Sequence, residues 1–254
     1  MTVCFFGNGE VGVEVLSFLI HKREKIGVVV LHQKENSRNY KELINLAKKN
    51  GALVIHDSDL LDDSCVLLLK SMGLAIGVSA FFNHIIRPEV IDIFGKGIIN
   101  LHTSFLPWNR GSNPNVWSII KNDPVGVSIH IIDEGVDTGP IIAQKTVEVP
   151  MHFTAKDLYS ALQESVVQLF KDTWPKVKSE NYTLIDQHHV TGTVNFRKDL
   201  AQLKSLDLNE SMTIKETLNI LRACMFPPYQ TAYFEIEGTR YNVEINITKI
   251  DEGN

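Results

Sequence analysis

The stretch VCFFGNGEVGVEVLSFL, residues 3–19, joins an apolar run, a glycine-rich turn and a segment of mixed polarity. The run Val3–Phe6 predicts a buried strand, and the apolar spacing over Val11–Leu19 predicts a helix. Between them, Gly7, Gly9 and Gly12 fit the pattern G-x-G-x-x-G. A strand that turns directly into a helix is the first unit of a β-α sheet, so this stretch predicts an α/β fold.

The same alternation of short apolar runs and amphipathic segments continues along the first half of the chain. Further strands are expected at Ile26–Leu31, Ala52–Ile55, Leu74–Val78 and Gly97–Leu101. Helices are expected at Tyr40–Asn50, Asp62–Ser71 and Pro114–Lys121. Repeated units of this kind predict a Rossmann-like, mostly parallel sheet flanked by helices.

The second half of the chain predicts the end of this sheet and a small appended domain. Two adjacent strands at Val125–Ile131 and Ile141–Val149 and a long helix at Thr154–Lys178 complete the large domain. The polar segment Asp186–Thr193 marks a boundary, which divides the chain into a catalytic domain, residues 1–185, and a small α+β domain, residues 195–254. The small domain is expected to contain a helix at Thr213–Ala223 and a hairpin that turns at Glu237-Gly238.

Composition narrows the functional classes. The chain has 254 residues and a net charge of −5, whereas proteins that bind nucleic acid usually concentrate Lys and Arg on one face. Neither a signal peptide nor an apolar run long enough to span a bilayer is recognisable, so we expect a cytoplasmic protein without a nucleic-acid or membrane partner. Cys4, Cys65 and Cys224 are odd in number and widely spaced, which favours buried thiols over disulfides or a zinc site.

The glycine-rich turn is not sufficient evidence for a nicotinamide cofactor. A dinucleotide-binding fold needs an acidic residue about twenty positions further on, and the corresponding position near His32 has no carboxylate beside it. We expect instead that Asn8 and Gly9 approach a phosphate or another ligand through backbone amides.

The residues best suited to catalysis follow a buried strand. Asn100 and His102 are two positions apart, so their side chains point to the same side of the strand, at an end where α/β sheets bind ligands. An amide can stabilise an oxyanion and an imidazole can move a proton, which suits acyl transfer. Asp137, in the turn DEGVDTGP, could orient His102. The alternatives are that the histidine is an ordinary loop residue and the acid an ordinary turn residue.

The other histidines are interpreted as structural or solvent-facing residues. His130 is expected in the middle of a strand, His32 at the end of one, and His188-His189 in the boundary segment, without metal-ligand spacing. No metal site is expected.

Three motifs in order resemble those of the folate-dependent formyltransferase family: N-x-H at 100–102, LP-x-x-RG at 106–111 and D-x-G-x-D-T-G-P at 133–140. The resemblance covers about residues 1 to 180. It implies that 10-formyltetrahydrofolate is the formyl donor, that Asn100 binds the formyl oxygen, that His102 assists proton transfer and that Asp137 supports His102 or an ordered water. It also implies that the pterin ring is bound by the loop containing Ala80, Phe82 and Ile85 and by the turn containing Asp133, Gly135 and Val136.

The formyl acceptor is suggested by the segment RGSNPNVW, residues 110–117, which is similar to the sugar N-formyltransferases, where P-N-x-W is common. From Asn195 onward the chain has seven Lys and Arg against nine Asp and Glu, whereas a tRNA-binding domain should be basic. The resemblance therefore favours a UDP- or dTDP-linked amino sugar of the kind used in cell-surface polysaccharide biosynthesis. Arg110, Asn8 and Gly9 are the candidate phosphate contacts.

Other functions stay open from sequence alone. The chain could formylate methionyl-tRNA, hydrolyse formyltetrahydrofolate with water as the acceptor, or bind a ligand without catalysis. The apolar hairpin near Phe234 and Tyr241 is a candidate homodimer interface.

Overall fold

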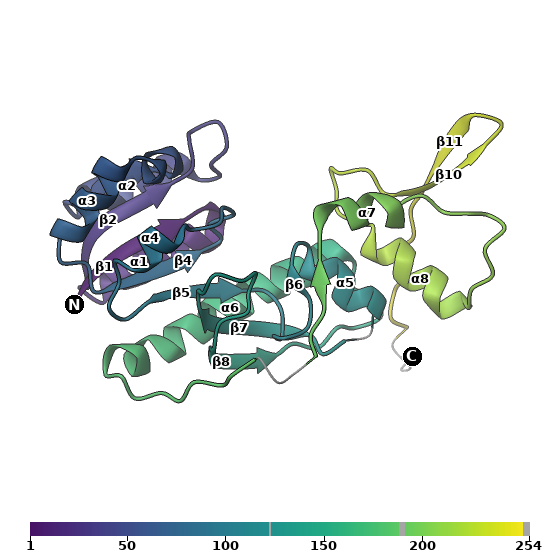
Figure 1. Cartoon of the computed structure of the whole chain (residues 1–254). Coiled ribbons are helices and arrows are strands. Elements are labelled where there is room, and N and C mark those ends of the chain that lie inside the picture. The colour runs from purple at the N-terminus through teal and green to yellow at the C-terminus, as the bar shows by residue number, and fades with distance from the viewer. Residues whose placement is uncertain (122, 188–190, 251–254) are drawn as a thin grey trace. The chain divides into compact units, whose positions relative to one another are not determined.

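The computed structural model describes residues 1–121, 123–187 and 191–250 and contains a seven-stranded sheet (Figure 1). The strand order in this sheet is β3-β2-β1-β4-β5-β7-β8. Its strands are β1 (Thr2–Gly7), β2 (Lys25–Leu31), β3 (Leu53–His56), β4 (Ile76–Ala80), β5 (Ile98–His102), β7 (Gly126–Ile131) and β8 (Ile141–Thr146). Two small sheets consist of β6 (Arg110–Gly111) with β9 (Val194–Asn195) and β10 (Ala232–Ile236) with β11 (Thr239–Val243).

Helices connect most of these strands. They are α1 (Gly9–His21), α2 (Tyr40–Lys49), the 3-10 helix η1 (Asp57–Leu61), α3 (Asp63–Ser71), α4 (Pro88–Ile91), α5 (Pro114–Lys121), α6 (Ala155–Lys178), α7 (Arg197–Leu203) and α8 (Ile214–Ala223). Asp62 caps α3 by accepting a hydrogen bond from the Ser64 amide, and Thr213 with Glu216 forms a capping box at the start of α8. In the described part of the chain, no helix has both the length and the apolarity to cross a bilayer.

The sheet is parallel from β3 to β5, since β1 pairs in parallel with β2 and β4, β2 with β3, and β4 with β5. β7 then runs antiparallel to β5, with His130 opposite Asn100 and Ser128 opposite His102. The predicted Rossmann-like fold is therefore confirmed. Because the parallel strands end at one edge, the loops that follow β1 to β5 lie where this class of sheet binds ligands.

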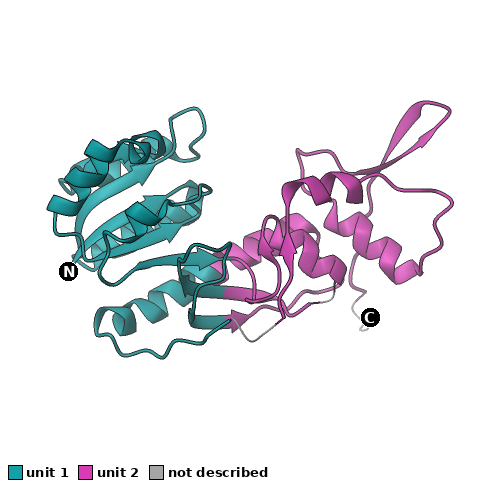
Figure 2. Cartoon of the chain, viewed as in Figure 1, with its two compact units in different colours: residues 1–102, 128–144, 166–189 teal, residues 103–127, 145–165, 190–254 magenta. Residues whose placement is uncertain are grey.

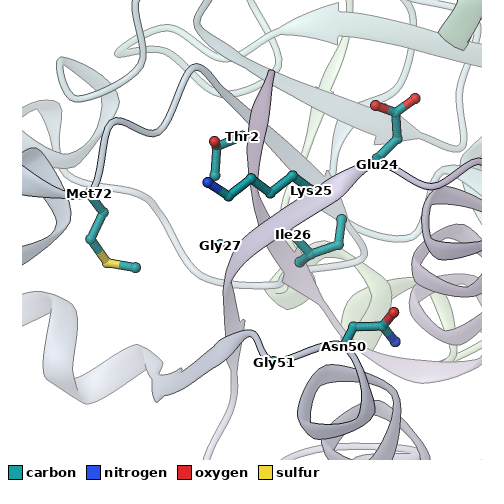
Figure 3. A pocket seen from close by; sticks show the side chains of 8 residues that line it. All are labelled: Thr2, Glu24, Lys25, Ile26, Gly27, Asn50, Gly51 and Met72. Atoms are coloured by element: carbon teal, nitrogen blue, oxygen red, sulfur yellow. The ribbon is translucent and has the colours of Figure 1, made fainter.

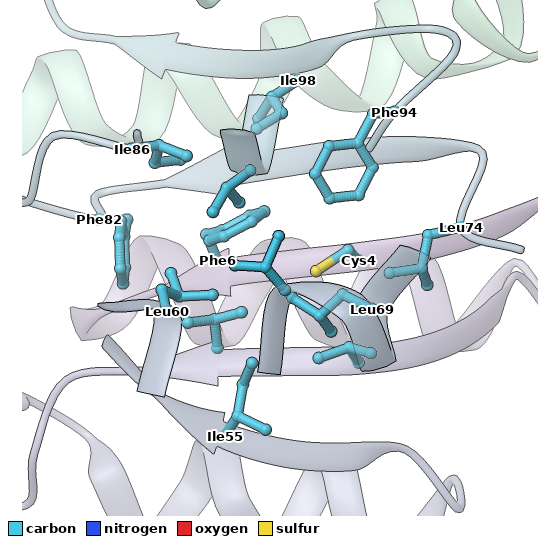
Figure 4. Packing of buried hydrophobic residues seen from close by; sticks show 14 residues of the cluster. Cys4, Phe6, Ile55, Leu60, Leu69, Leu74, Phe82, Ile86, Phe94 and Ile98 are labelled. Atoms are coloured by element: carbon cyan, nitrogen blue, oxygen red, sulfur yellow. The ribbon is translucent and has the colours of Figure 1, made fainter. Parts of the chain in front are cut away.

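One face of the sheet packs into a continuous apolar core (Figure 4). Phe6 is fully buried, and its ring meets the rings of Phe82 and Phe94 edge-on at centroid distances of 5.5 and 6.1 Å. Cys4 lies in the same cluster, and burial raises the pKa of its thiol, as expected for an inert core cysteine. This packing fixes the strands whose ends carry the candidate catalytic residues.

The chain forms two compact units that do not follow its linear order (Figure 2). The first comprises residues 1–102, 128–144 and 166–189, and the second comprises residues 103–127, 145–165 and 190–254. The C-terminal segment thus shares one unit with two segments from the middle of the chain.

Arg222 of α8 ties parts of the second unit together. Its guanidinium is buried and donates hydrogen bonds to the carbonyl oxygens of Pro150, Met151 and Phe153, at 3.2, 3.3 and 3.0 Å. Burial lowers the pKa of this guanidinium, and its neighbours are acceptors that satisfy the charge. Beside α8, a small cluster of Leu221, Cys224 and Ala232 forms the apolar centre of the C-terminal segment.

Candidate active site

Asn100 is the central residue of β5, and its side-chain amide is held on both sides. Ser79 of β4 donates its hydroxyl to Asn100 Oδ1 at 2.8 Å, and Asn100 Nδ2 lies 3.1 Å from His130 Nε2. Ser79 is the direct neighbour of Asn100 in the β4–β5 register, and His130 is its neighbour on β7. Strand pairing therefore fixes the orientation of this amide.

His102 and Asp137 meet beside this amide. His102 Nδ1 lies 3.6 Å from Asp137 Oδ1, and His130 Nε2 lies 3.5 Å from the same oxygen. The two imidazole rings are 6.1 Å apart and nearly perpendicular. The side chains of Asn100, His102 and Asp137, predicted as a group, are thus connected through shared neighbours in the first unit.

The turn that carries Asp137 is braced internally. Asp133 Oδ1 accepts hydrogen bonds from the Gly135 amide at 3.1 Å and from the Thr138 hydroxyl at 2.7 Å. The buried Gln187 donates its side-chain amide to the carbonyl oxygens of Asp137 and Gly139. Asp137 has a φ of 53°, in the left-handed region that Asp tolerates better than most residues. The geometry of the turn, rather than flexibility of the carboxylate, sets where Asp137 points.

His130 is the residue that sequence reasoning missed, because it was interpreted as structural or solvent-facing. It is buried, and it contacts both Asn100 and Asp137. Its Nδ1 lies 2.9 Å from the Ile131 carbonyl oxygen, which can only accept, so Nδ1 carries a proton. In the neutral ring Nε2 is then the acceptor for the Asn100 amide. The signal that could have found it is cross-strand register, which the sequence alone does not provide.

Two elements carry the residues predicted to bind folate. Ala80 is the last residue of β4 and is buried, and the ring of Phe82 packs into the core. A ligand at this loop would therefore contact the backbone of these two residues and not their side chains. Ile85 is 88 % exposed and Val136 is half-exposed. An exposed isoleucine and an exposed valine provide the kind of apolar surface that a flat heteroaromatic ring covers.

The predicted phosphate contacts have different surroundings. The Asn8 amide donates to the Ala80 carbonyl oxygen at 3.1 Å, and the Gly9 amide donates to the Arg38 carbonyl oxygen at 3.2 Å. Asn8 Oδ1 also accepts a hydrogen bond from the Arg38 amide at 2.7 Å. A phosphate could use these two backbone amides only after they leave their protein acceptors. Arg110 lies on β6 in the second unit.

A separate pocket of about 380 Å³ lies at the amino ends of β1 and β2 (Figure 3). Its lining residues are Thr2, Glu24, Lys25, Ile26, Gly27, Asn50, Gly51 and Met72. The pocket lies at the edge of the sheet opposite to the carboxyl ends of β4 and β5. Its lining residues therefore do not belong to the group around Asn100.

The chemistry available to the group is that of acyl transfer. Neither the bond from Ser79 nor that to His130 uses the second N–H of Asn100, which is the type of donor that stabilises a developing oxyanion. His102 presents Nδ1 to the Asp137 carboxylate at 3.6 Å, and an imidazole beside a carboxylate is a type of group that can exchange a proton.

Comparison with known proteins agrees with this chemistry. The profile of the family described as Formyl transferase matches residues 3–173, and that described as N-formyltransferase dimerization C-terminal domain matches residues 199–249. The chain belongs to the formyl transferase family, which confirms the resemblance seen in its motifs. Its enzymatic class is therefore that of a formyltransferase.

Relatives with different acceptors are similar to this chain. A methionyl-tRNA formyltransferase from Thermodesulfovibrio yellowstonii is 31% identical over 99% of this chain and 81% of its own length. A dTDP-4-amino-4,6-dideoxyglucose formyltransferase from Mycobacterium bovis is 37% identical over 56% of this chain and 60% of its own length.

Solved structures with the same fold include two formyltransferases. A 4-N formyltransferase from Francisella tularensis superposes with a TM-score of 0.82 over 98% of both chains, at 24% identity. A formyltransferase from Anoxybacillus kamchatkensis, solved with UDP-4,6-dideoxy-4-formamido-L-AltNAc and tetrahydrofolate, superposes with a TM-score of 0.60 at 27% identity, over 80% of this chain and 89% of that one.

Proposed function

We propose that this protein transfers the formyl group of 10-formyltetrahydrofolate to the primary amine of a nucleotide-linked amino sugar. The observation that carries the transfer chemistry is that Asn100, His102 and Asp137 are linked through close contacts, with His130 lying against both Asn100 and Asp137. The folate donor is supported by the relative from Anoxybacillus kamchatkensis, which was solved with tetrahydrofolate and a formylated UDP-sugar.

The reaction begins when the lone pair of the neutral sugar amine attacks the formyl carbon. A C–N bond forms, the carbonyl electrons move to oxygen, and the oxyanion accepts the N–H of Asn100. His102 takes the proton that the attacking nitrogen loses, and the Asp137 carboxylate stabilises the imidazolium. The bond between the formyl carbon and N10 of the folate then breaks and its electrons go to N10. The His102 imidazolium returns its proton to N10, and the products are a formamide and tetrahydrofolate.

The sugar acceptor is supported by two observations. The 37% identity to the dTDP-4-amino-4,6-dideoxyglucose formyltransferase is higher than the 31% identity to the methionyl-tRNA enzyme, although it spans a shorter segment. The chain from Asn195 onward has seven Lys and Arg against nine Asp and Glu, whereas a domain that binds the phosphates of tRNA should be basic. We assign UDP or dTDP as the nucleotide and Arg110 as its candidate phosphate ligand.

Methionyl-tRNA is the second candidate acceptor, because the relative that forms it covers nearly the whole chain. A tRNA substrate predicts that KM rises steeply with salt, since each phosphate contact releases counterions. A nucleotide sugar, with two phosphates, predicts a shallow dependence.

We also propose that two copies of this chain form a homodimer. Residues 199–249 match a family domain described by its dimerization, and they include exposed apolar side chains of the hairpin, Ile236 and Tyr241. Burial of these side chains between two chains is favourable.

The deciding assay mixes purified protein and 10-formyltetrahydrofolate with UDP- and dTDP-linked 3-amino and 4-amino sugars, or with methionyl-tRNA, and follows products by mass spectrometry. We expect a formamide on at least one nucleotide sugar and none on methionyl-tRNA. Formylation of methionyl-tRNA alone would reject the sugar acceptor, and formate release that no amine stimulates would identify a hydrolase instead.

A further inference from the structure

A second group of chemically active side chains lies at the ends of β2, β3 and β4. His32 follows β2, Asp57 follows β3 and His84 is in the loop after β4. Asp57 Oδ2 lies 2.9 Å from His32 Nδ1 and 2.9 Å from His84 Nδ1. Sequence patterns do not indicate this group, because its members are far apart in the chain and lack metal-ligand spacing.

We propose that His32, Asp57 and His84 form a binding site for one divalent transition-metal ion of the Zn²⁺ type. Two imidazole nitrogens and one carboxylate oxygen are a donor set that suits Zn²⁺, Co²⁺ or Ni²⁺ better than Mg²⁺ or Ca²⁺.

The distances are close to those that an ion requires. One donor atom from each residue lies within 4.8 Å of the other two. Around a tetrahedral Zn²⁺ with bonds of about 2.0–2.1 Å, donor atoms are about 3.4 Å apart. The two 2.9 Å separations therefore need to widen by about half an ångström, which small side-chain rotations provide.

The surroundings hold two of the three ligands in place. The His32 ring is buried and stacks on Phe82, with centroids 4.7 Å apart and planes 6° from parallel. The other carboxylate oxygen of Asp57 accepts the Ser58 amide at 2.9 Å, an outer-shell bond of the kind that orients metal ligands. His84 is 56% exposed, so an ion can enter from its side and keep water as a fourth ligand.

The carboxyl group of Asp57 suits ligation at neutral pH, because an aspartate side chain is ionised there and metal ligands must be deprotonated to bind.

Ligation through Nδ1 has a consequence for the loop after β4. His32 Nε2 lies 3.4 Å from the Asn83 amide, and it can accept that N–H only while its own proton is on Nδ1. When an ion takes Nδ1, the proton moves to Nε2 and faces the Asn83 amide. Ion binding must therefore shift this amide, and the shift provides a signal that is independent of catalysis.

The test uses the untagged full-length protein after chelator treatment. Titration with Co²⁺ should give visible absorption that saturates at one ion per chain, and calorimetry with Zn²⁺ should give the same stoichiometry, whereas Mg²⁺ should give no heat. The Asn83 amide resonance should shift on addition of Zn²⁺.

Variants separate a specific site from surface binding. His84→Ala removes an exposed ligand and Asp57→Asn removes the charge, and each should weaken Zn²⁺ binding by more than about 100-fold, beyond what loss of an outer-shell contact costs. His152→Ala removes an exposed histidine of the second unit and should leave binding unchanged. Absence of stoichiometric binding, or equal binding by His84→Ala, Asp57→Asn and the parent protein, would overturn the proposal.

Discussion

At Asn100, the two sides of the amide perform separable tasks, since Oδ1 accepts from Ser79 and the nitrogen provides the donors. Asn100→Ala should lower kcat by about two to three decades, because removal of a single oxyanion donor typically lowers kcat by this factor. It also leaves the buried Ser79 hydroxyl without its acceptor, at a cost of about 1–3 kcal/mol in stability. Steady-state kinetics and thermal unfolding measure the two effects.

Asn100→Asp separates catalysis from folding, because the carboxylate still accepts from Ser79 but provides no N–H. We expect it to be as inactive as Asn100→Ala while it unfolds nearer the temperature of the parent. Asn45→Ala, on the exposed face of α2, is the matched control and should retain full activity. Substantial turnover by Asn100→Asp would contradict an oxyanion role.

His130 contacts Asn100 and Asp137 and is neither the oxyanion donor nor the proton acceptor of the proposed mechanism, so we expect its loss to produce a milder defect. His130→Phe retains a ring but removes the acceptor for Asn100 and the contact with Asp137. We expect kcat to fall by about 10- to 100-fold with little change in the KM for folate, as for a misplacement of about 1 Å. A well-folded His130→Phe enzyme with the parent kcat would show that strand pairing alone positions Asn100.

At the scale of elements, the turn from Asp133 to Pro140 depends on a close backbone approach. A Cβ on Gly139 would lie 2.0 Å from the Ile131 carbonyl oxygen, so Gly139→Ala must push the turn away from β7. We expect a loss of about 1–3 kcal/mol in stability and a lower kcat, because Asp137 moves with the turn. Denaturant unfolding and kinetics measure both changes.

Gly95→Ala is the control for this substitution, because a Cβ there meets no atom within 4 Å and the φ of Gly95 is not in the left-handed region. It should change neither stability nor kcat by much. Equal effects of the two substitutions would mean that the tight approach at Gly139 does not constrain the site.

Periodicity predicted the long elements well and the short ones poorly. The predicted helix Pro114–Lys121 has the observed bounds, and the predicted strand Leu74–Val78 is shifted to Ile76–Ala80. The elements α4, α7, η1, β6 and β9 were not predicted, since two to seven residues carry too little periodicity. Their positions are set by tertiary contacts, as for β6, which pairs with β9 from a distant segment.

Sequence motifs predicted three residues of the candidate site. They missed the fourth, whose position depends on how two strands pair. Asn100, His102 and Asp137 are in motifs, whereas His130 reaches the site only because β7 pairs antiparallel with β5. The roles of these residues, the folate contacts, the domain boundary and a cytoplasmic location stay predictions. The interpretation of His188-His189 falls outside the described residues.

For the whole molecule, the C-terminal hairpin is the element expected to join two chains. Phe234 and Tyr241 stack across its strands with centroids 5.3 Å apart, and Ile236 and Tyr241 are nearly half-exposed. Placing charges there, as in Ile236→Asp with Tyr241→Asp, should convert the dimer to monomers, because a buried unpaired carboxylate is costly. Light scattering coupled to size exclusion gives the mass directly.

Leu61→Asp is the control, because Leu61 is an exposed leucine in η1, outside residues 199–249. It should leave the mass unchanged. If the hairpin variant has the same mass as the parent protein, residues 236 and 241 do not contribute to a dimer interface.

The bonds of Arg222 restrict how this enzyme can be recombined with its relatives. A chimera that replaces the C-terminal segment with a foreign one retains the carbonyl groups of Pro150, Met151 and Phe153, and they need a hydrogen-bond donor at the position of Arg222. Grafts that preserve an arginine there should give more soluble protein than grafts that do not. Replacement of the C-terminal segment in order to change the substrate must therefore first satisfy the three carbonyl groups that bind Arg222.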